Sequence, residues 1–432
     1  MQIQELYLIY LKHPYIQTDT RKLKEGDLYF ALKGPNFNGN LFAKQAIGDG
    51  AAFAIVDEKI KDPDERIIYV TDVLKTLQEL AAYHRSQFNL NTEAKQVPFI
   101  AVTGSNGKTT SKELIHAVLS TIYKTYTTEG NLNNHIGIPL TILKIKQDAE
   151  MAIIEMGANH QKEIEAYCTY TMPTHGVITN CGKAHLEGFG SEEGIRKGKG
   201  ELFDYLRQHN GTAFVMWDYD YLQKMSSGIS NVITYGTQNA SVTGKIKNSK
   251  GLLEVSITSG ADIDAIETSL VGEYNLPNIL LAVAIGKYFN VPDEKIKLAL
   301  ENYVPSNSRS QLIEKESNKI ILDAYNANPS SMTAAIENFA KMNGNNKLLI
   351  LGGMMELGKE SIKEHQSLVD LINTYDWKTV VLVGGDFNKV NHSYLNFENS
   401  EKAKEWFKAQ HFQDTHILIK GSRSMQMEKV LE

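Results

Sequence analysis

The residues that could do chemistry are most concentrated at positions 103–110, which read TGSNGKTT. A short apolar run at residues 97–102 precedes them, and apolar residues at helical spacing follow them. Strand, glycine loop, Lys-Thr and helix is the arrangement that phosphate binding needs, because glycines let backbone N–H groups approach an anion and the helix N-terminus adds partial positive charge. We therefore predict a nucleotide site in which Lys108 reaches the terminal phosphates and the Thr109 hydroxyl binds Mg²⁺.

The loop departs from the standard G-x-x-x-x-G-K-[ST] spacing, because Val102 stands where the first glycine would be. On the pattern alone, a strand-to-helix turn with a chance lysine is the alternative. The stretch predicts nucleotide binding and leaves the type of enzyme open.

Two more reactive side chains follow predicted strands. Glu155 ends the apolar run at residues 151–155, and His185 lies shortly after the run at residues 176–179. Because strand ends in an open α/β sheet face the ligand crevice, the two could converge on one metal ion. A solvated strand end for Glu155 and a structural role for His185 are the alternatives.

Two polar segments have both a functional and a structural interpretation. A helix is predicted over residues 195–206, where composition alone favours a solvated cationic face for Lys197 and Lys199. Residues 18–21 (TDTR) bring two hydroxyls, a carboxylate and a guanidinium into one short loop. They could bind a ribose or a phosphate, and a surface turn explains them equally well.

Length and composition limit the class of protein. The 432 residues predict two to four domains, and a net charge of −6 gives no support for a nucleic-acid partner. The two cysteines form neither a disulfide framework nor a zinc pattern, which indicates a reducing compartment. No signal peptide or membrane-spanning run is recognisable, so we expect a cytoplasmic protein without membrane insertion.

The elements that must position these residues follow an α/β pattern in three segments. Residues 1–95 predict a small α/β domain, and the polar stretch 89–96 marks its end. Residues 96–305 contain the phosphate loop, and their alternating runs between 213 and 271 predict partly antiparallel strands. In residues 306–432 strands and helices alternate, which predicts a parallel sheet with right-handed crossovers.

Several motifs in one order resemble the Mur ligases, the ATP-dependent amide-forming enzymes of peptidoglycan precursor synthesis. The TGSNGKTT loop is that superfamily's form of the phosphate loop, and folylpolyglutamate synthases share it. The similarity spans the whole chain. The other motifs are DTRKLKEGDLYFALKG at 19–34, GNLNNHIGIPLTIL at 130–143, IIEMGANHQKEI at 153–164, AHLEGFGS at 184–191, KGELF at 199–203, NSRSQL at 307–312, DAYNANPSSM at 323–332 and KGSRSM at 420–425.

The resemblance implies three domains: a small N-terminal α/β domain for the UDP substrate, a central P-loop ATPase-like parallel sheet for ATP, and a C-terminal Rossmann-like domain for an incoming dipeptide. It also implies a reaction. ATP would phosphorylate the terminal carboxylate of UDP-N-acetylmuramoyl-tripeptide, and the amine of D-alanyl-D-alanine would attack the acyl phosphate. We expect the chain to act as a monomer.

The resemblance further implies two Mg²⁺ sites and a carbamylated lysine, because a carboxylate and a γ-phosphate must meet among several cations. The implied catalytic residues are Lys108, His185, Lys199 and Arg309. The implied metal ligands are Thr109, Glu155, His185 and Lys199. The implied ATP-binding residues are Gly104, Asn106, Gly107, Lys108, Thr109, Thr110, Asn275, Asn278, Arg309 and Asp323. The implied substrate-binding residues are Thr20, Arg21, Gly34, Asn38, Asn134, Asn326, Asn328, Lys420, Ser422 and Arg423.

Three places in the sequence depart from the family's pattern. Residues 38–40 read Asn-Gly-Asn where Asp-Gly-His or Asp-Ala-His is frequent. Tyr274 stands where a histidine usually precedes the adenine-binding asparagine, and its ring could still stack on the base. Gly353 replaces a frequent aspartate, so no role is assigned there.

Three other functions are the alternatives. A tripeptide-forming Mur ligase carries an Asp-Asn-Pro-Arg motif, whereas residues 326–330 here read NANPS and lack the arginine. A folate-tailing ligase shares the loop but does not explain the N-terminal segment. A nucleotide-dependent switch without chemistry would tolerate the loss of Glu155, His185 or Lys199, and the chain keeps all three.

Overall fold

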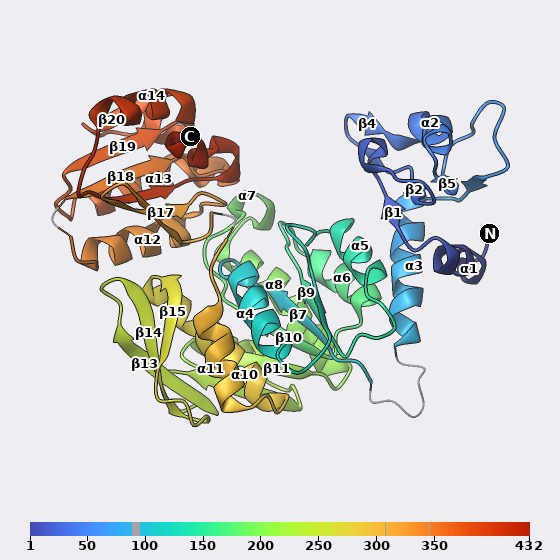
Figure 1. Cartoon of the computed structure of the whole chain (residues 1–432), viewed down its shortest axis with the longest axis horizontal. Helices are drawn as coiled ribbons and strands as arrows, with labels where there is room; N and C mark the ends of the chain where they lie inside the picture. Colours follow the sequence, from blue (N-terminus) through green and yellow to red (C-terminus); the bar gives the residue numbers. More distant parts are fainter. Residues whose placement is uncertain (89–95, 307, 345) are drawn as a thin grey trace. The chain divides into compact units, whose positions relative to one another are not determined.

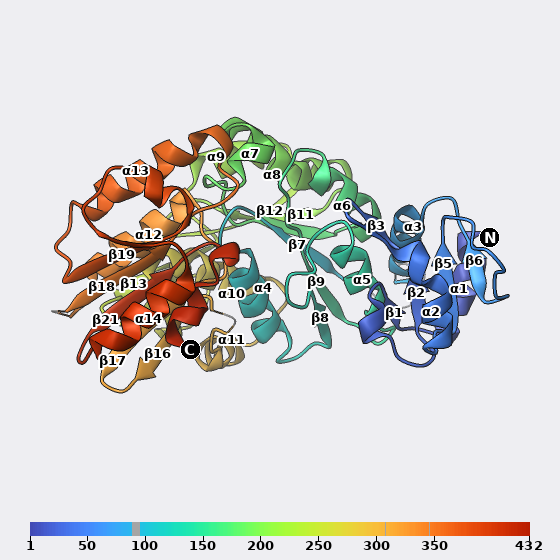
Figure 2. The ribbon, with the colours of Figure 1, turned by 90° about the horizontal axis from the view of Figure 1, so that it is seen from above.

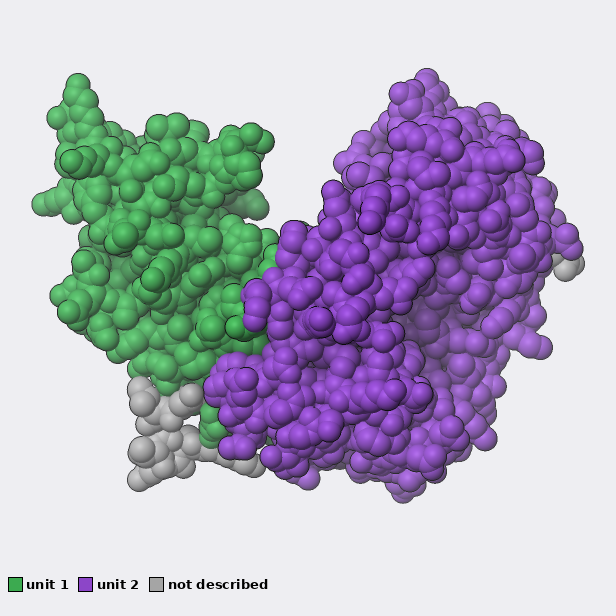
Figure 3. All heavy atoms as spheres, turned by 180° about the vertical axis from the view of Figure 1, so that it is seen from behind, with its two compact units in different colours: residues 1–101, 123–157, 163–175 green, residues 102–122, 158–162, 176–432 purple. Residues whose placement is uncertain are grey.

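The computed structural model describes residues 1–88, 96–306, 308–344 and 346–432. The chain divides into two compact units, coloured in Figure 3: unit 1 is Met1–Ala101, Tyr123–Gly157 and Glu163–His175, and unit 2 is Val102–Ile122, Ala158–Lys162 and Gly176–Glu432. The predicted boundary at 89–96 lies, except for Gln96, outside the described residues. Within those ranges no helix combines the length and apolar character needed to cross a membrane.

Unit 1 begins with a small parallel sheet, which Figure 1 shows in blue. Its order is β1-β2-β5-β6, with β1 at Ile16–Gln17, β2 at Leu28–Phe30, β5 at Phe53–Val56 and β6 at Ile67–Tyr69. Alanines of α2 pack on Tyr29 and Val56 in its core. The other elements are α1 (Ile3–Lys12), η1 (Thr20–Lys22), the hairpin β3 (Lys33–Gly34) and β4 (Phe37–Asn38), η2 (Gly39–Phe42), α2 (Ala43–Gly48) and α3 (Val73–Gln87).

The rest of unit 1 contains β8 (Thr125–Thr127), which pairs in parallel with β9 (Met151–Glu155), and the helices α5 (Gly137–Leu143) and α6 (Glu163–Thr171). Strand β7 (Phe99–Thr103) begins here and continues into unit 2. It confirms the predicted strand, but it starts two residues later than expected, after Pro98, which has no backbone N–H to donate.

Arg85 at the end of α3 connects the two parts of unit 1. Its side chain is fully buried, with Nε donating to the Thr171 carbonyl at 3.0 Å and Nη2 to the Met172 carbonyl at 3.1 Å. Its guanidinium carbon also lies 3.7 Å from the centroid of the Phe99 ring. A buried cation with these contacts fixes α3 against the segment that follows α6.

We expect Arg85→Met to lower the free energy of unfolding by about 2–3 kcal/mol, because the apolar stem is kept while two carbonyls lose a charged donor. Urea unfolding followed by circular dichroism measures the change. The control is Arg66→Met, which removes an exposed pair with Asp64 and should cost less than about 0.5 kcal/mol. Equal stabilities for the two variants would contradict a structural role for Arg85.

The central part of unit 2 has strands in the order β15-β14-β13-β12-β11-β10. β11 to β13 pair in parallel, whereas β14 is antiparallel to both its neighbours, which confirms the predicted partly antiparallel strands. The strands are β10 (His175–Ile178), β11 (Thr212–Met216), β12 (Asn231–Gly236), β13 (Val242–Asn248), β14 (Leu252–Ser259) and β15 (Ile266–Val271). The helices are α4 (Lys108–Leu119), α7 (Leu186–Phe189), α8 (Glu192–Gln208), α9 (Asp220–Met225), η3 (Glu273–Asn275), α10 (Leu276–Tyr288) and α11 (Asp293–Asn302).

The C-terminal part of unit 2 is a six-stranded sheet in the order β16-β17-β21-β18-β19-β20. The pairs β17–β21, β21–β18, β18–β19 and β19–β20 are parallel, as the alternation of strands and helices predicts. The β16–β17 pair is antiparallel, which the sequence did not predict, because β16 precedes β17 directly as the first strand of a hairpin. The strands are β16 (Gln311–Lys315), β17 (Asn318–Asp323), β18 (Lys347–Gly352), β19 (Thr379–Val383), β20 (Leu395–Phe397) and β21 (His416–Lys420). The helices are α12 (Pro329–Lys341), η4 (Gly358–Glu360), α13 (Ser361–Ile372), η5 (Gly385–Lys389), α14 (Ser400–Gln410), η6 (Arg423–Met425) and η7 (Met427–Leu431).

Alternating residues of these strands face two separate cores. Leu349 and Leu351 face α12 and α13, whereas Leu348 and Ile350 face α14. Figure 2 shows the helices on opposite faces of the sheet. Because both faces of the sheet are covered by apolar cores, the polar residues that bind ligands are expected at the strand ends.

Candidate active site

The phosphate loop follows β7 and ends at the first residue of α4. Gly107 is the N-cap of α4 with φ +79°, and Gly104 has φ +141°. A Cβ atom would lie 2.0 Å from Thr179 Oγ1 at position 104 and 2.8 Å from Asn278 Oδ1 at position 107. Both positions therefore require glycine, and the loop leads into the first turn of α4, where backbone N–H groups can bind an anion.

We expect Gly107→Ala to weaken ADP binding at least about tenfold, because left-handed backbone disfavours alanine and the new methyl group collides with Asn278. Isothermal titration with ADP and Mg²⁺ measures the effect. Gly251→Ala is the control, since no atom lies within 4 Å of a Cβ built there. An unchanged ADP affinity in Gly107→Ala would show that the loop does not bind the nucleotide.

Two residues after β10 hold the loop in place. The Asn180 side chain accepts from the Asn106 N–H at 3.1 Å and donates to the Asn106 carbonyl at 3.0 Å. The Thr179 hydroxyl donates to the same carbonyl at 2.6 Å, and the Ser105 N–H donates to the Asn180 carbonyl at 2.8 Å. Sequence reasoning assigned no role to Thr179 and Asn180, although polar residues directly after a buried strand were the available signal.

The predicted phosphate-binding side chains lie at the start of α4. The Lys108 ammonium donates to the carbonyls of Gly104 at 2.8 Å and Ser105 at 3.2 Å, so it lies over its own loop. Thr109 is buried and Thr110 is half-buried. A lysine that donates to these loop carbonyls can turn to a phosphate, which is a stronger acceptor than a carbonyl.

The predicted adenine-binding pair, Asn275 and Asn278, lies beside Gly107 and the first turn of α4. The Asn278 amide donates to Asn275 Oδ1 at 2.9 Å and accepts from the Ser111 hydroxyl at 3.0 Å. Asn275 in turn donates to the Val271 carbonyl at 2.8 Å. Both asparagines are buried, so the structure places them together as a hydrogen-bonded pair between α4 and α10.

Residues of the C-terminal part also reach the loop. The Asn328 amide donates to Asn106 Oδ1 at 2.7 Å, while its own Oδ1 caps α12 through the Ser331 N–H at 2.9 Å. The Lys183 N–H donates to the Ser330 hydroxyl at 2.9 Å. The N-terminus of α12 is therefore joined to the phosphate loop, which the sequence did not predict.

His185 lies where the central part meets the loop after β18. His185 and Glu356 both have left-handed backbone, with φ of 54° and 61°, and His185 Nδ1 forms a hydrogen bond with Glu356 Oε2. This hydrogen bond lowers the pKa of the Glu356 carboxyl below its usual range. The Glu187 N–H also donates to the Glu356 carbonyl at 3.1 Å. A carboxylate on Nδ1 fixes an imidazole ring in the way that oriented metal ligands are fixed.

Lys199 is a buried lysine of α8. It is 1% exposed, its Nζ donates to the Ala158 carbonyl at 3.0 Å, and it lies 5.1 Å from the centroid of the Phe189 ring. Lys197, two residues earlier, is exposed. The solvated cationic face is therefore right for Lys197 and wrong for Lys199, because the helix turns the two side chains in different directions.

The predicted nucleotide residues of the C-terminal part lie around the end of β17. Asp323 Oδ2 accepts from Lys420 Nζ at 2.6 Å, and the same ammonium donates to the Asn326 carbonyl at 3.1 Å. The guanidinium carbon of Arg309 lies 3.6 Å from the centroid of the Tyr325 ring. Lys420 is buried, and Asn326 is exposed.

The segment after β21 contains two more predicted substrate residues. The Ser422 hydroxyl is buried and donates to the Gly353 carbonyl at 2.7 Å, whereas Arg423 is exposed and pairs with Glu428 at 2.8 Å. A Cβ at position 353 would lie 2.7 Å from Gly385 Cα. The glycine that departs from the family's pattern is thus required by close packing of two backbones.

In unit 1, Glu155 is 1% exposed at the end of β9. Its carboxylate accepts from Asn133 Nδ2 at 2.8 Å, and its N–H donates to the Thr128 hydroxyl at 3.0 Å. Asn134 is exposed, and its Oδ1 accepts from the N–H groups of Ile136 at 3.1 Å and Gly137 at 2.8 Å, just before and at the start of α5. In the described part of the chain, no three His, Cys, Asp or Glu side chains form a metal cluster.

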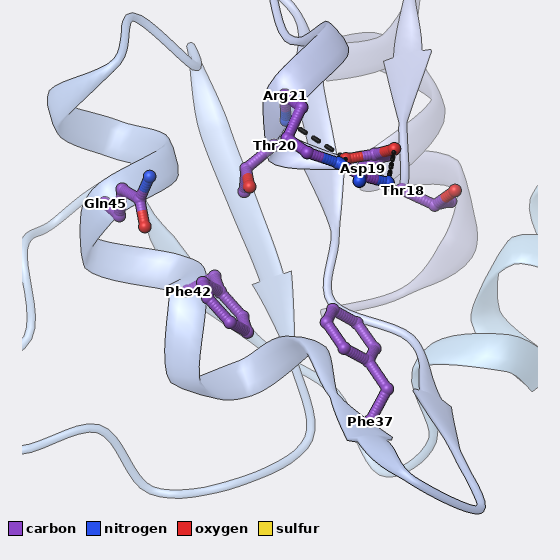
Figure 4. A pocket seen from close by; sticks show the side chains of 7 residues that line it. All are labelled: Thr18, Asp19, Thr20, Arg21, Phe37, Phe42 and Gln45. Atoms are coloured by element: carbon purple, nitrogen blue, oxygen red, sulfur yellow. Dashed lines mark hydrogen bonds and ion pairs between the residues drawn. The ribbon is translucent and has the colours of Figure 1, made fainter.

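Unit 1 also contains a pocket of 620 Å³, shown in Figure 4. Asp19 and Arg21 form a bidentate ion pair at its edge, and the Arg21 hydrogen bonds hold the pKa of Asp19 at about 2. The Phe37 and Phe42 rings stack with centroids 5.4 Å apart. The lining residues are Thr18, Asp19, Thr20, Arg21, Phe37, Phe42 and Gln45.

The predicted Thr20 and Arg21 line this pocket, whereas Gly34 and Asn38 belong to the adjacent hairpin. Asn38 donates to Glu58 at 2.9 Å, and its Oδ1 accepts from the side chain of Asn40 at 3.0 Å. The asparagines that depart from the family's pattern therefore form hydrogen bonds at the end of the hairpin.

Family models and curated relatives both match this chain along most of its length. Three family models match: "Mur ligase family, catalytic domain" at residues 14–85, "Mur ligase middle domain" at 102–286 and "Mur ligase, glutamate ligase domain" at 308–423. A UDP-N-acetylmuramoyl-tripeptide–D-alanyl-D-alanine ligase of Escherichia coli is 35% identical, and one of Bacillus subtilis is 33% identical. Each alignment covers 96% of this chain and 92% of the relative.

Solved structures of Mur ligases are similar to this chain in fold. MurF from Acinetobacter baumannii superposes with a TM-score of 0.87 at 29% identity, covering 100% of this chain and 97% of that one. MurF ligase from Thermotoga maritima in complex with ADP also has a TM-score of 0.87, at 26% identity, covering 98% and 97%. A folylpolyglutamate synthase of the same organism, at 13% identity and a TM-score of 0.58, shares the fold. Sequence, domain content and three-domain α/β fold lead to one conclusion: the chain belongs to the Mur ligase family.

Proposed function

We propose that the protein joins D-alanyl-D-alanine to UDP-N-acetylmuramoyl-tripeptide and converts ATP to ADP and phosphate. The observation that carries the proposal is the full-length similarity, at 33–35% identity, to two ligases of that activity. The adenine nucleotide is supported by the phosphate loop of this chain and by the ADP complex of a similar structure.

The reaction has two steps. A carboxylate oxygen of the tripeptide attacks the γ-phosphorus of ATP, and ADP leaves. The amine of D-alanyl-D-alanine then attacks the acyl carbon, a tetrahedral intermediate forms, and phosphate leaves as the amide forms and the amine gives up a proton. Negative charge develops at the phosphoryl oxygens first and at the acyl oxygen second, so fixed cations accelerate both steps.

We propose that the start of α4 binds the phosphates of ATP. The N–H groups of the loop from Gly104 to Gly107 would face the phosphate oxygens, with the Lys108 ammonium on the terminal phosphates. Arg309 would contact a phosphate from the C-terminal part, where Asp323 would accept from the ribose. Asn275 and Asn278 would bind adenine.

The donor set suits Mg²⁺, which prefers oxygen ligands: the Thr109 hydroxyl and the Glu155 carboxylate would hold one ion. A second ion would lie near His185 and Lys199. When bound, Mg²⁺ neutralises phosphate charge. A carbamate on Lys199 would keep one N–H for the Ala158 carbonyl and would add two oxygen donors for the ion.

We further propose that the pocket of unit 1 takes the UDP part of the substrate. Thr20 and Arg21 supply a hydroxyl and a guanidinium, and Phe37 and Phe42 supply an aromatic surface for a base. Asn326, Asn328 and the segment Lys420–Arg423 would hold the dipeptide. The protein would act as a monomer in the cytoplasm, where its two buried cysteines stay reduced.

The decisive experiment measures phosphate release with ATP, Mg²⁺ and UDP-N-acetylmuramoyl-tripeptide, comparing D-alanyl-D-alanine with single amino acids. We expect turnover only with the dipeptide. Turnover with a diamino acid on the UDP-dipeptide would place the enzyme one step earlier, as a tripeptide-forming ligase. Absence of turnover with every acceptor, in protein that binds ADP, would support a nucleotide-binding module.

A further inference from the structure

Arg309 lies in a turn of unusual backbone conformation. Ser308 and Ser310 on either side of it have φ of 55° and 48°, in the left-handed region that non-glycine residues rarely occupy. Each such residue is unfavourable by about 1–2 kcal/mol unless its surroundings compensate. The turn therefore depends on contacts outside itself.

Ser310 has two such contacts. Its hydroxyl forms a hydrogen bond of 3.0 Å with the Tyr274 hydroxyl, and its N–H donates to Asp323 Oδ1 at 3.3 Å. Tyr274 comes from η3, directly before Asn275, so it ties the C-terminal turn to the adenine side of the central part. Burial raises the pKa of the Tyr274 hydroxyl, which keeps it neutral and able to donate.

The Tyr274 ring has a fixed place. Gly272 has φ +98°, and a Cβ there would lie 2.3 Å from Tyr274 Cε1. The ring therefore occupies the space that a side chain at position 272 would need.

The Arg309 side chain is held by a second aromatic residue. Its guanidinium lies over the Tyr325 ring at 3.6 Å, a cation–π contact that restricts where the planar group can point. Tyr325 follows Asp323 at the end of β17, so the same segment that carries the proposed ribose ligand also supports the arginine.

We propose that Tyr325 and Tyr274 are positioning residues for Arg309: the Tyr325 ring orients the guanidinium, and the Tyr274 hydroxyl fixes the turn that carries it. The inference rests on the proposed role of Arg309 on a phosphate of ATP. It adds two residues that act through the arginine.

The test uses the full-length protein and the variants Tyr325→Leu, Tyr325→Phe, Tyr274→Phe and Arg309→Ala. Tyr325→Leu should lower kcat about tenfold, because it removes the aromatic face, and Tyr325→Phe should restore it to within about twofold. Tyr274→Phe keeps the ring and removes one hydrogen bond, so kcat should fall about twofold to tenfold. Titration with ADP should give unchanged affinity in all three tyrosine variants, and equal melting temperatures show that they fold.

A double-mutant comparison separates the possible failures. If Tyr325 acts through Arg309, adding Tyr325→Leu to Arg309→Ala should cause no further loss. Wild-type activity of Arg309→Ala would overturn the role of the arginine itself and, with it, this inference. An inactive Arg309→Ala together with wild-type kcat in Tyr325→Leu and Tyr274→Phe would overturn the inference alone and leave the proposed function standing.

Discussion

Lys199→Ala should lower the rate of ligation by at least about a hundredfold while ADP still binds with near wild-type affinity. The reason is the position of the side chain: it is buried at the Ala158 carbonyl, on a helix that is separate from the phosphate loop. If Lys199 has the proposed role, its removal takes away a group that the acyl transfer needs and leaves the nucleotide contacts intact. Phosphate release with both substrates present measures the first effect, and isothermal titration measures the second.

Lys197→Ala is the matched control, because Lys197 lies on the same helix and is exposed, and it should behave as wild type. Bicarbonate should not rescue Lys199→Ala, since alanine offers no amine to carbamylate. Carbon-13 NMR with labelled bicarbonate should show a carbamate signal in the wild type and none in Lys199→Ala. Full ligation activity in the variant would remove Lys199 from the reaction, whereas an inactive variant with no carbamate signal in the wild type would assign the role to the ammonium form.

Lys108→Ala is the second substitution with a large expected effect: kcat/KM for ATP should fall about 10²–10³-fold. Lys108 directly follows the glycine loop in the sequence. Its ammonium donates to the backbone carbonyls of Gly104 and Ser105 in that loop. In the transition state of phosphoryl transfer it would meet oxygens that carry more charge than those carbonyls. Phosphate release at varied ATP concentration measures the loss.

Lys250→Ala serves as its control, because Lys250 is exposed in the turn between β13 and β14. That variant should keep the wild-type kcat/KM. If Lys108→Ala were as active as Lys250→Ala, the loop would bind its anion through backbone groups and α4 alone, and the proposed part of Lys108 would be wrong.

The local elements of this protein are determined by its sequence. The run at 151–155 becomes β9 over the same residues, and the strand, glycine loop and Lys-Thr at 97–110 become β7, the phosphate loop and α4. These segments depend on short-range properties: apolar runs, left-handed glycines and a helix start. The order of motifs along the chain was also sufficient to indicate the family that the comparisons show.

The partners of the site residues were decided only by the tertiary structure. Sequence spacing predicts neither the contact of Asn328 with Asn106, which are 222 positions apart, nor the pairing of His185 with Glu356. It gave Thr179 and Asn180 no role, although they hold the phosphate loop. Local patterns show which residues share an element, whereas these contacts depend on how separate elements pack.

Lys197 and Lys199 show the same division within one helix. Composition treats both as members of a basic segment, and the helix predicted over 195–206 lies within the longer α8 (Glu192–Gln208). Which lysine is exposed depends on the face of α8 that packs on the rest of unit 2, and that face buries Lys199 and leaves Lys197 outside. The sequence determined the elements and the chemistry that they carry, and the packing decided which side chains meet, because burial and hydrogen-bond partners arise only when distant segments come together.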